Sequence, residues 1–217
     1  MLKAYTHKLK YSQKGITGIE TAIILIAFVV VAAVFAYAVL SAGLYSSQKS
    51  QEAVYEGLKT AEGTVILKGG MVAVAANPGD TGYISQLSFT VGLAMTGDAI
   101  DFTPPATTGT DGLAPSDSTN KVVLSYIDSY QKVDDLFWTC DPLGSASDDY
   151  LLDPDEQFQI TIGSDTQGAS GGNLEDALTH HLGINTKFTI EIKTAVGSTL
   201  TLERTTPAYL SSVMNFQ

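Results

Sequence analysis

The chain has 217 residues and a formal net charge of −11, from 12 basic and 23 acidic residues. Hydrophobic residues make up 44% of it and charged residues 16%, a composition too apolar for an intrinsically disordered chain. The acidic balance argues against a nucleic-acid-binding protein, because phosphates are neutralised by lysine and arginine, and the single cysteine, Cys140, excludes an internal disulfide and a multi-cysteine zinc site.

Charge is unevenly distributed along the chain. Residues 1–15 contain no acid and four lysines, which are Lys3, Lys8, Lys10 and Lys14. Without them, eight basic residues face 23 acidic ones, a charge of −15. Residues 22–40 then follow without any charge. The sequence therefore predicts a basic leader, one membrane anchor and an acidic domain of about 150 residues.

The uncharged segment 22–40 has the length and composition of a membrane-spanning helix. Its large apolar residues are Ile23, Ile24, Leu25, Ile26, Phe28, Val29, Val30, Val31, Val34, Phe35, Val39 and Leu40. At roughly −0.3 to −0.6 kcal/mol each, these twelve contribute about −4 to −7 kcal/mol toward membrane insertion. The lysines that precede the segment predict a cytoplasmic N-terminus and an external acidic domain.

The helical pattern continues beyond the apolar segment. An amphipathic stripe is formed by Val54, Leu58, Ala61 and Val65. We therefore expect one helix from Ile16 to about Leu67, roughly 78 Å long at 1.5 Å per residue. The residues Lys68-Gly69-Gly70 are expected to end it. Such a helix is longer than a bilayer is thick, so its second half needs another surface to cover it.

Residues 71–217 show the alternation of half-buried strands. The expected strands are 71–76, 87–95, 122–126, 136–138, 158–162, 188–192 and 200–202. Seven short strands separated by glycine, proline, aspartate and serine turns favour a β-sandwich. Residues 103–120 are expected to form an exposed loop, and residues 174–182 a short helical turn.

No catalytic motif is found in the chain, so we expect neither enzymatic activity nor a cofactor. Zinc-protease, serine-hydrolase and phosphate-loop patterns do not occur. His180 and His181 are adjacent and point in different directions, which is typical of a polar surface turn. Cys140 has no nearby histidine in sequence and is expected to be a buried structural thiol.

One acidic cluster is a weak candidate for a metal site. It consists of Asp148, Asp149, Asp153, Asp155 and Glu156. Calcium prefers several oxygen ligands, but the spacing is not that of an EF-hand loop. A solvated acidic turn that leads into a strand is the favoured interpretation, with metal binding as the alternative.

The junction between the leader and the apolar segment resembles a known signal. Lys14-Gly15 followed by Ile16-Thr17-Gly18-Ile19-Glu20 and a long apolar run is similar to the class III signal of type IV pilin-like proteins. Residues 38–59, 133–140, 151–162 and 185–210 resemble archaellins, the filament subunits of the archaeal swimming organelle. The resemblance extends from Lys14 to the C-terminus, and the C-terminal segments favour archaellin over pilin.

The resemblance implies an α+β fold, in which a long N-terminal hydrophobic helix precedes an immunoglobulin-like antiparallel β-sandwich. It divides the chain into a signal peptide (1–15) that is removed, a helix (16–68) and an outer domain (69–217). The helix would span the membrane in the precursor and form the filament core after assembly. Cleavage between Gly15 and Ile16 would make Glu20 the fifth residue of the mature chain.

The same resemblance implies the partners and the location. The product would be an extracellular archaellum filament of identical subunits, and only the precursor would lie in the membrane. A prepilin-peptidase-like membrane protease, the archaellum motor with its membrane platform, and other archaellins are the implied partners, with no nucleic acid. The alternatives are an adhesive type IV pilus subunit and a membrane-anchored surface protein that does not polymerise.

Two details of the resemblance remain open at this point. Glu20 lies four residues after Ile16, so it is placed to pair with the new amino group of its own chain or of a neighbour. The simpler alternative is an interfacial glutamate favoured by the helix dipole. Many archaellins carry N-linked glycans, but this sequence contains no Asn-x-Ser/Thr site, which leaves O-linked sugar on the threonine-rich loop 103–120 as the alternative.

Overall fold

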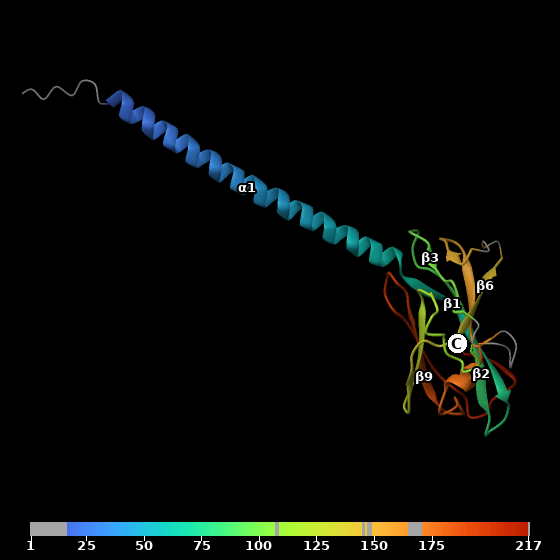
Figure 1. Cartoon of the computed structure of the whole chain (residues 1–217). Helices are drawn as coiled ribbons and strands as arrows, with labels where there is room; N and C mark the ends of the chain where they lie inside the picture. The colour runs from blue at the N-terminus through green and yellow to red at the C-terminus, as the bar shows by residue number, and fades with distance from the viewer. Residues whose placement is uncertain (1–16, 107–108, 145, 147–148, 165–170, 217) are drawn as a thin grey trace, which may run out of the picture. The chain divides into compact units, whose positions relative to one another are not determined.

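The computed structural model describes residues 17–106, 109–144, 146, 149–164 and 171–216. Its first element is α1 (Thr17–Glu62), with Glu20 in the first turn and Lys59 in the last, charges that complement the helix dipole. The contacts divide the chain into two compact units, Met1–Val54 and Tyr55–Gln217. Figure 1 shows α1 and the strands that follow it.

The helix ends earlier than expected. We predicted that it would reach Leu67, but α1 ends at Glu62 and β1 (Val65–Asn77) begins three residues later. The amide of Gly63 donates to the Lys59 carbonyl (3.0 Å), and the amide of Ala94 donates to the Thr64 carbonyl (2.9 Å). Val65 is buried as part of the sheet. The run Thr64-Val65-Ile66 is β-branched and fits a pleated, half-buried surface better than a helix.

The pair Gly69-Gly70 was wrongly interpreted as the end of the helix. It lies inside β1, where the register with β2 (Tyr83–Leu93) shifts between Leu67 and Met71. Leu67 faces Val91 and Met71 faces Phe89, so β1 contains two more residues than β2 over this stretch. Gly69 has a φ of +103°, a conformation open to glycine and strained for other residues. The glycines therefore form a β-bulge.

Two antiparallel sheets make up most of the second unit. The five-stranded sheet has the order β11 (Val213–Phe216), β1, β2, β8 (Gln157–Ile162) and β6 (Trp138–Leu143). The four-stranded sheet has the order β10 (Leu200–Thr205), β9 (Lys187–Lys193), β4 (Val123–Asp128) and β5 (Lys132–Val133). The remaining elements are the pair β3 (Ile100–Asp101) and β7 (Leu151–Leu152) and the short helix α2 (Leu174–Ala177).

The core lies between the two sheets. Alternate residues of β2, β8 and β9 are buried, and they belong to one hydrophobic cluster. Phe188 of β9 and Phe216 of β11 meet edge to face at 6.0 Å, which joins the two sheets. Phe102 meets both Trp138 and Phe158 edge to face at 6.2 Å. The predicted fold class, a long apolar helix followed by an antiparallel β-sandwich, is therefore confirmed.

Most of the predicted strands lie inside observed ones. The exceptions are Ala94 and Met95, which lie beyond β2, Val122, which precedes β4, and Leu136 and Phe137, which precede β6. Leu136 forms an isolated bridge with Leu113. The sequence did not predict the two-residue strands β3, β5 and β7, nor β11. Within residues 174–182 only Leu174–Ala177 are helical.

The loop 103–120 is more tightly held than its composition predicted. Pro105 and Gly112 are buried, so the expectation of a wholly exposed loop is wrong for them. The Gly112 carbonyl accepts from the Phe137 amide (2.8 Å), and the Ala114 amide donates to the Asp135 carbonyl (2.8 Å). These bonds anchor the loop to the segment that leads into β6.

Candidate assembly site

The apolar part of α1 is uncovered on every side. Its twelve large apolar residues, from Ile23 to Leu40, have exposed fractions between 55% and 73%. α1 is long and apolar enough to cross a membrane. At about 1.5–3 kcal/mol for each buried side chain, covering all twelve stabilises the helix by roughly 18–36 kcal/mol relative to water. A surface of this size requires either lipid or other protein around it.

Glu20 lies at the edge of this apolar surface. It is exposed in the first turn of α1, one turn before Ile24. The predicted cleavage residues Gly15 and Ile16 lie outside the described residues. A salt bridge between Glu20 and the amino group of Ile16 therefore stays a prediction.

The helical glycines have open space around them. A side chain added at Gly18, Gly43 or Gly57 would meet no atom of this chain within 4 Å. Their small size is thus not required by packing within the chain. Small residues on a helix allow a second helix to approach closely, which suits a helix that packs against other copies.

The last turn of α1 is held closely by the unit Tyr55–Gln217, of which it is part. A Cβ atom built on Gly97 would lie 2.4 Å from the Glu62 Cβ, and one on Gly63 would lie 2.7 Å from the Val196 carbonyl oxygen. The Ser198 hydroxyl lies 3.4 Å from that of Thr64. The segments around Gly97 and Val196 therefore fix the end of the helix by direct contact with its backbone.

The two adjacent histidines lie on the surface, as the sequence predicts. His180 stacks on Tyr130 with ring centroids 5.7 Å apart, and His181 stacks on Tyr83 at 4.7 Å. The Gln131 Oε1 accepts from the backbone amides of Thr179 (3.0 Å) and His180 (3.2 Å). These contacts hold the histidine turn against the β4–β5 connection, which is a structural role.

The acidic candidates for a metal site form local turns. Asp148 lies outside the described residues. The Asp149 carboxylate accepts from the Leu151 amide (3.1 Å), and Glu156 accepts from the Asp153 amide (3.3 Å). Among the described residues, no group of three histidine, cysteine, aspartate or glutamate side chains is placed to hold a metal ion. The hydrogen bonds instead shape the turn that leads into β8.

Cys140 is a buried free thiol in β6, in agreement with the sequence-based expectation. Burial, with a smaller contribution from the charge of Asp141, raises the pKa of the Cys140 thiol to about 12. Nucleophilic attack requires the thiolate, so this thiol is unreactive near neutral pH.

Reaction with a thiol reagent tests whether the Cys140 thiol is unreactive in the folded protein. At pH 8 a pKa of about 12 leaves on the order of one thiol in 10⁴ ionised, so the native protein should label very slowly. In denaturant the pKa returns to about 8.5, and labelling should become faster by three orders of magnitude or more. Rapid labelling of the folded protein at pH 8 would contradict the buried, protonated thiol. A Cys140→Ser variant has no thiol and measures the background signal of the reagent.

Comparison with known proteins shows where this arrangement recurs. The model of the archaeal-type flagellin family matches residues 15–204. The chain is 36% identical over 208 residues to "Probable flagellin 1" of Archaeoglobus fulgidus, covering 94% of this chain and 95% of the relative. It is 33% identical over 214 residues to "Probable flagellin 2" of the same organism, covering 95% and 96%.

A solved structure is also similar. The archaeal flagellum of Methanospirillum hungatei strain JF1 matches 89% of this chain and 99% of its own, with 26% identity and a TM-score of 0.54.

Proposed function

The chain belongs to the archaeal-type flagellin family, and from this we propose that it is a structural subunit of the archaellum filament used for swimming. The observation that supports this best is the apolar surface of α1, exposed on all sides in the single chain. Identical subunits in a helical array cover that surface with one another's helices. The β-domains then form the outside of the filament.

The precursor is proposed to mature at the membrane. The lysines of the leader keep the N-terminus in the cytoplasm, and a prepilin-peptidase-like protease cuts between Gly15 and Ile16. Residues 1–15 are the signal peptide, the helix ends at Glu62, and the outer domain begins with β1 at Val65. The transfer of α1 from lipid to a bundle of other helices costs little, because both surroundings are apolar.

The outer domain gives the filament its surface properties. With the leader removed, the side chains carry a charge of −15. A dense anionic coat repels neighbouring filaments and keeps them apart in water. The archaellum motor and its membrane platform are the proposed partners at the base, and other archaellins are proposed partners along the filament.

Two measurements test the proposal. A mass spectrum of filaments sheared from cells should show a chain that begins at Ile16, and a strain that lacks the gene should fail to swim. An uncleaved chain in the membrane would contradict assembly, and would favour an anchored surface protein. Normal swimming with a loss of surface attachment would indicate an adhesive pilus instead.

Neutralising Glu20 should impair assembly more than insertion. We expect Glu20→Gln to enter the membrane normally, since it removes a charge from the apolar segment's edge. Loss of a charge-assisted pair, worth about 1.5–3 kcal/mol, should lower filament yield by roughly 10- to 100-fold. Glu56→Gln, the same change farther along α1, is the control and should assemble like the wild type. A normal yield from Glu20→Gln would refute the pairing role.

A further inference from the structure

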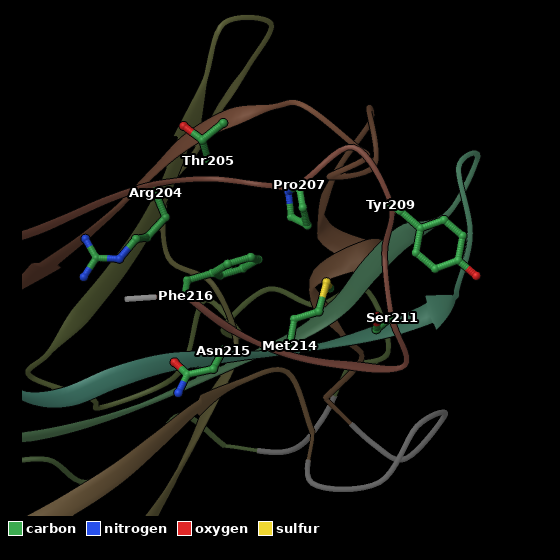
Figure 2. Close-up of a pocket in the computed structure, with 8 residues that line it drawn as sticks. All are labelled: Arg204, Thr205, Pro207, Tyr209, Ser211, Met214, Asn215 and Phe216. Carbon is green, nitrogen blue, oxygen red and sulfur yellow. The ribbon is translucent and has the colours of Figure 1, made fainter.

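A shallow groove of about 570 Å³ lies where the two sheets end side by side. It is lined by β10, by β11 and by the connection between them, and these are the edge strands of the four- and five-stranded sheets. Figure 2 shows Pro207, Met214 and Phe216 between Arg204 on one side and Tyr209 on the other. Tyr209 is 62% exposed and Met214 partly so, which leaves an apolar floor open to solvent.

Arg204 gives the groove its charge. It is the sole charged side chain in residues 204–216, and it forms no ion pair with the described residues. One guanidinium nitrogen donates to the Glu203 carbonyl (2.8 Å), while Nε is buried without a hydrogen-bond acceptor among the described residues. A planar, permanently charged guanidinium of this kind is suited to a carboxylate from outside the chain.

The connection between β6, the opposite edge strand of the five-stranded sheet, and β8 has complementary properties. Residues 133–186 contain eleven acidic residues and neither lysine nor arginine. Leu143 of β6, Tyr150 in the connection and Leu151 of β7 are 36–39% exposed. The carboxylates of Asp149 and Asp153 are exposed beside them in sequence. The β6–β8 connection thus combines exposed apolar side chains with exposed acidic residues next to them in sequence.

We propose that the groove receives the β6–β8 connection of a second copy of this chain, at Leu143, Tyr150 and Leu151, with Arg204 paired to its carboxylates. The inference rests on the proposed function and specifies which surfaces of the outer domains meet. Four inter-strand spacings of about 4.8 Å, roughly 19 Å in all, separate the two edges of the sheet. Because the two surfaces differ, the contact is head-to-tail and repeats from copy to copy, which is the type of contact that a helical filament requires.

Disulfide trapping tests the geometry. Filaments of a Ser211→Cys, Leu151→Cys double variant should yield a ladder of covalent oligomers on oxidation, since these positions lie on the groove and in the β6–β8 connection. The control is Ser211→Cys with Thr201→Cys, which places both cysteines on the groove edge. It should remain monomeric in denaturing gels. Native Cys140 is buried and is present in both variants.

Charge reversal tests the energetics. Arg204→Glu should lower the yield of filaments at least tenfold, whereas Lys132→Glu on the far edge of the four-stranded sheet should leave it near that of the wild type. Filaments that form but give no ladder, together with a normal yield from Arg204→Glu, would overturn the docking proposal alone. Absence of filaments from the wild-type chain would instead overturn the proposed function.

Discussion

A Val30→Lys variant is expected to reach the membrane as a precursor and to form almost no filaments. A lysine at the centre of a spanning helix costs about 2.5–3.5 kcal/mol on insertion. The eleven other large apolar residues of segment 22–40 contribute about −3 to −7 kcal/mol, which is comparable to or larger than that cost. Packed among apolar helices in a filament, the same charge has neither water nor a partner, and it recurs in every subunit. We expect filament yield to fall at least 100-fold.

Two assays separate these steps. The amount of precursor in the membrane fraction measures insertion, and electron microscopy of sheared cells measures assembly. Val30→Leu keeps the residue apolar and should behave like the wild type in both. Abundant filaments of Val30→Lys would show that the middle of α1 does not lie in the filament core.

The helix could be predicted from the sequence because its signal is compositional. An uninterrupted run from Ile23 to Leu40 without a polar face leaves no water-soluble alternative, and backbone hydrogen bonding in lipid requires a helix. The end of α1 could not be placed as reliably. Val65 continues the helical spacing of Leu58 and Ala61, yet it lies in β1. Pairing with β2 decided the outcome, and that partner is distant in sequence.

The interior strands were predictable for a similar reason. Phe158, Ile160 and Ile162 alternate because only one face of β8 meets the core. The two-residue strands β3, β5 and β7 are too short to show any period. Their formation depends on the neighbours that the fold supplies.

The groove at β10 and β11 has no signature in the sequence at all. Arg204 and Met214 are ten residues apart and belong to different sheets. Leu143 of β6 and Met214 of β11 lie on opposite edges of the five-stranded sheet only because the order β11-β1-β2-β8-β6 places β11 at one end and β6 at the other. Strand order depends on long-range pairing, so surfaces of this kind emerge only from the three-dimensional structure.

A Phe158→Ala variant should lose a large part of the stability of the β-domain. Phe158 is fully buried in β8, where it faces Val91 of β2 and Pro142 of β6 across the sheet, and its ring contacts Phe102 edge to face. Truncation of a buried phenylalanine costs about 3–5 kcal/mol, against a total of about 5–15 kcal/mol for a typical domain. The midpoint of thermal unfolding should fall by roughly 6–20 °C.

Trp138 is the single tryptophan and is fully buried, so its fluorescence reports unfolding of the detergent-solubilised chain. Tyr209→Ala is a matched control, because it truncates an aromatic side chain that is 62% exposed. It should shift the unfolding free energy by less than about 0.5 kcal/mol. If Tyr209 instead packs against a second copy, this control should weaken filaments while leaving the subunit stable. The two variants thus distinguish a residue that holds the domain together from one that joins domains to each other.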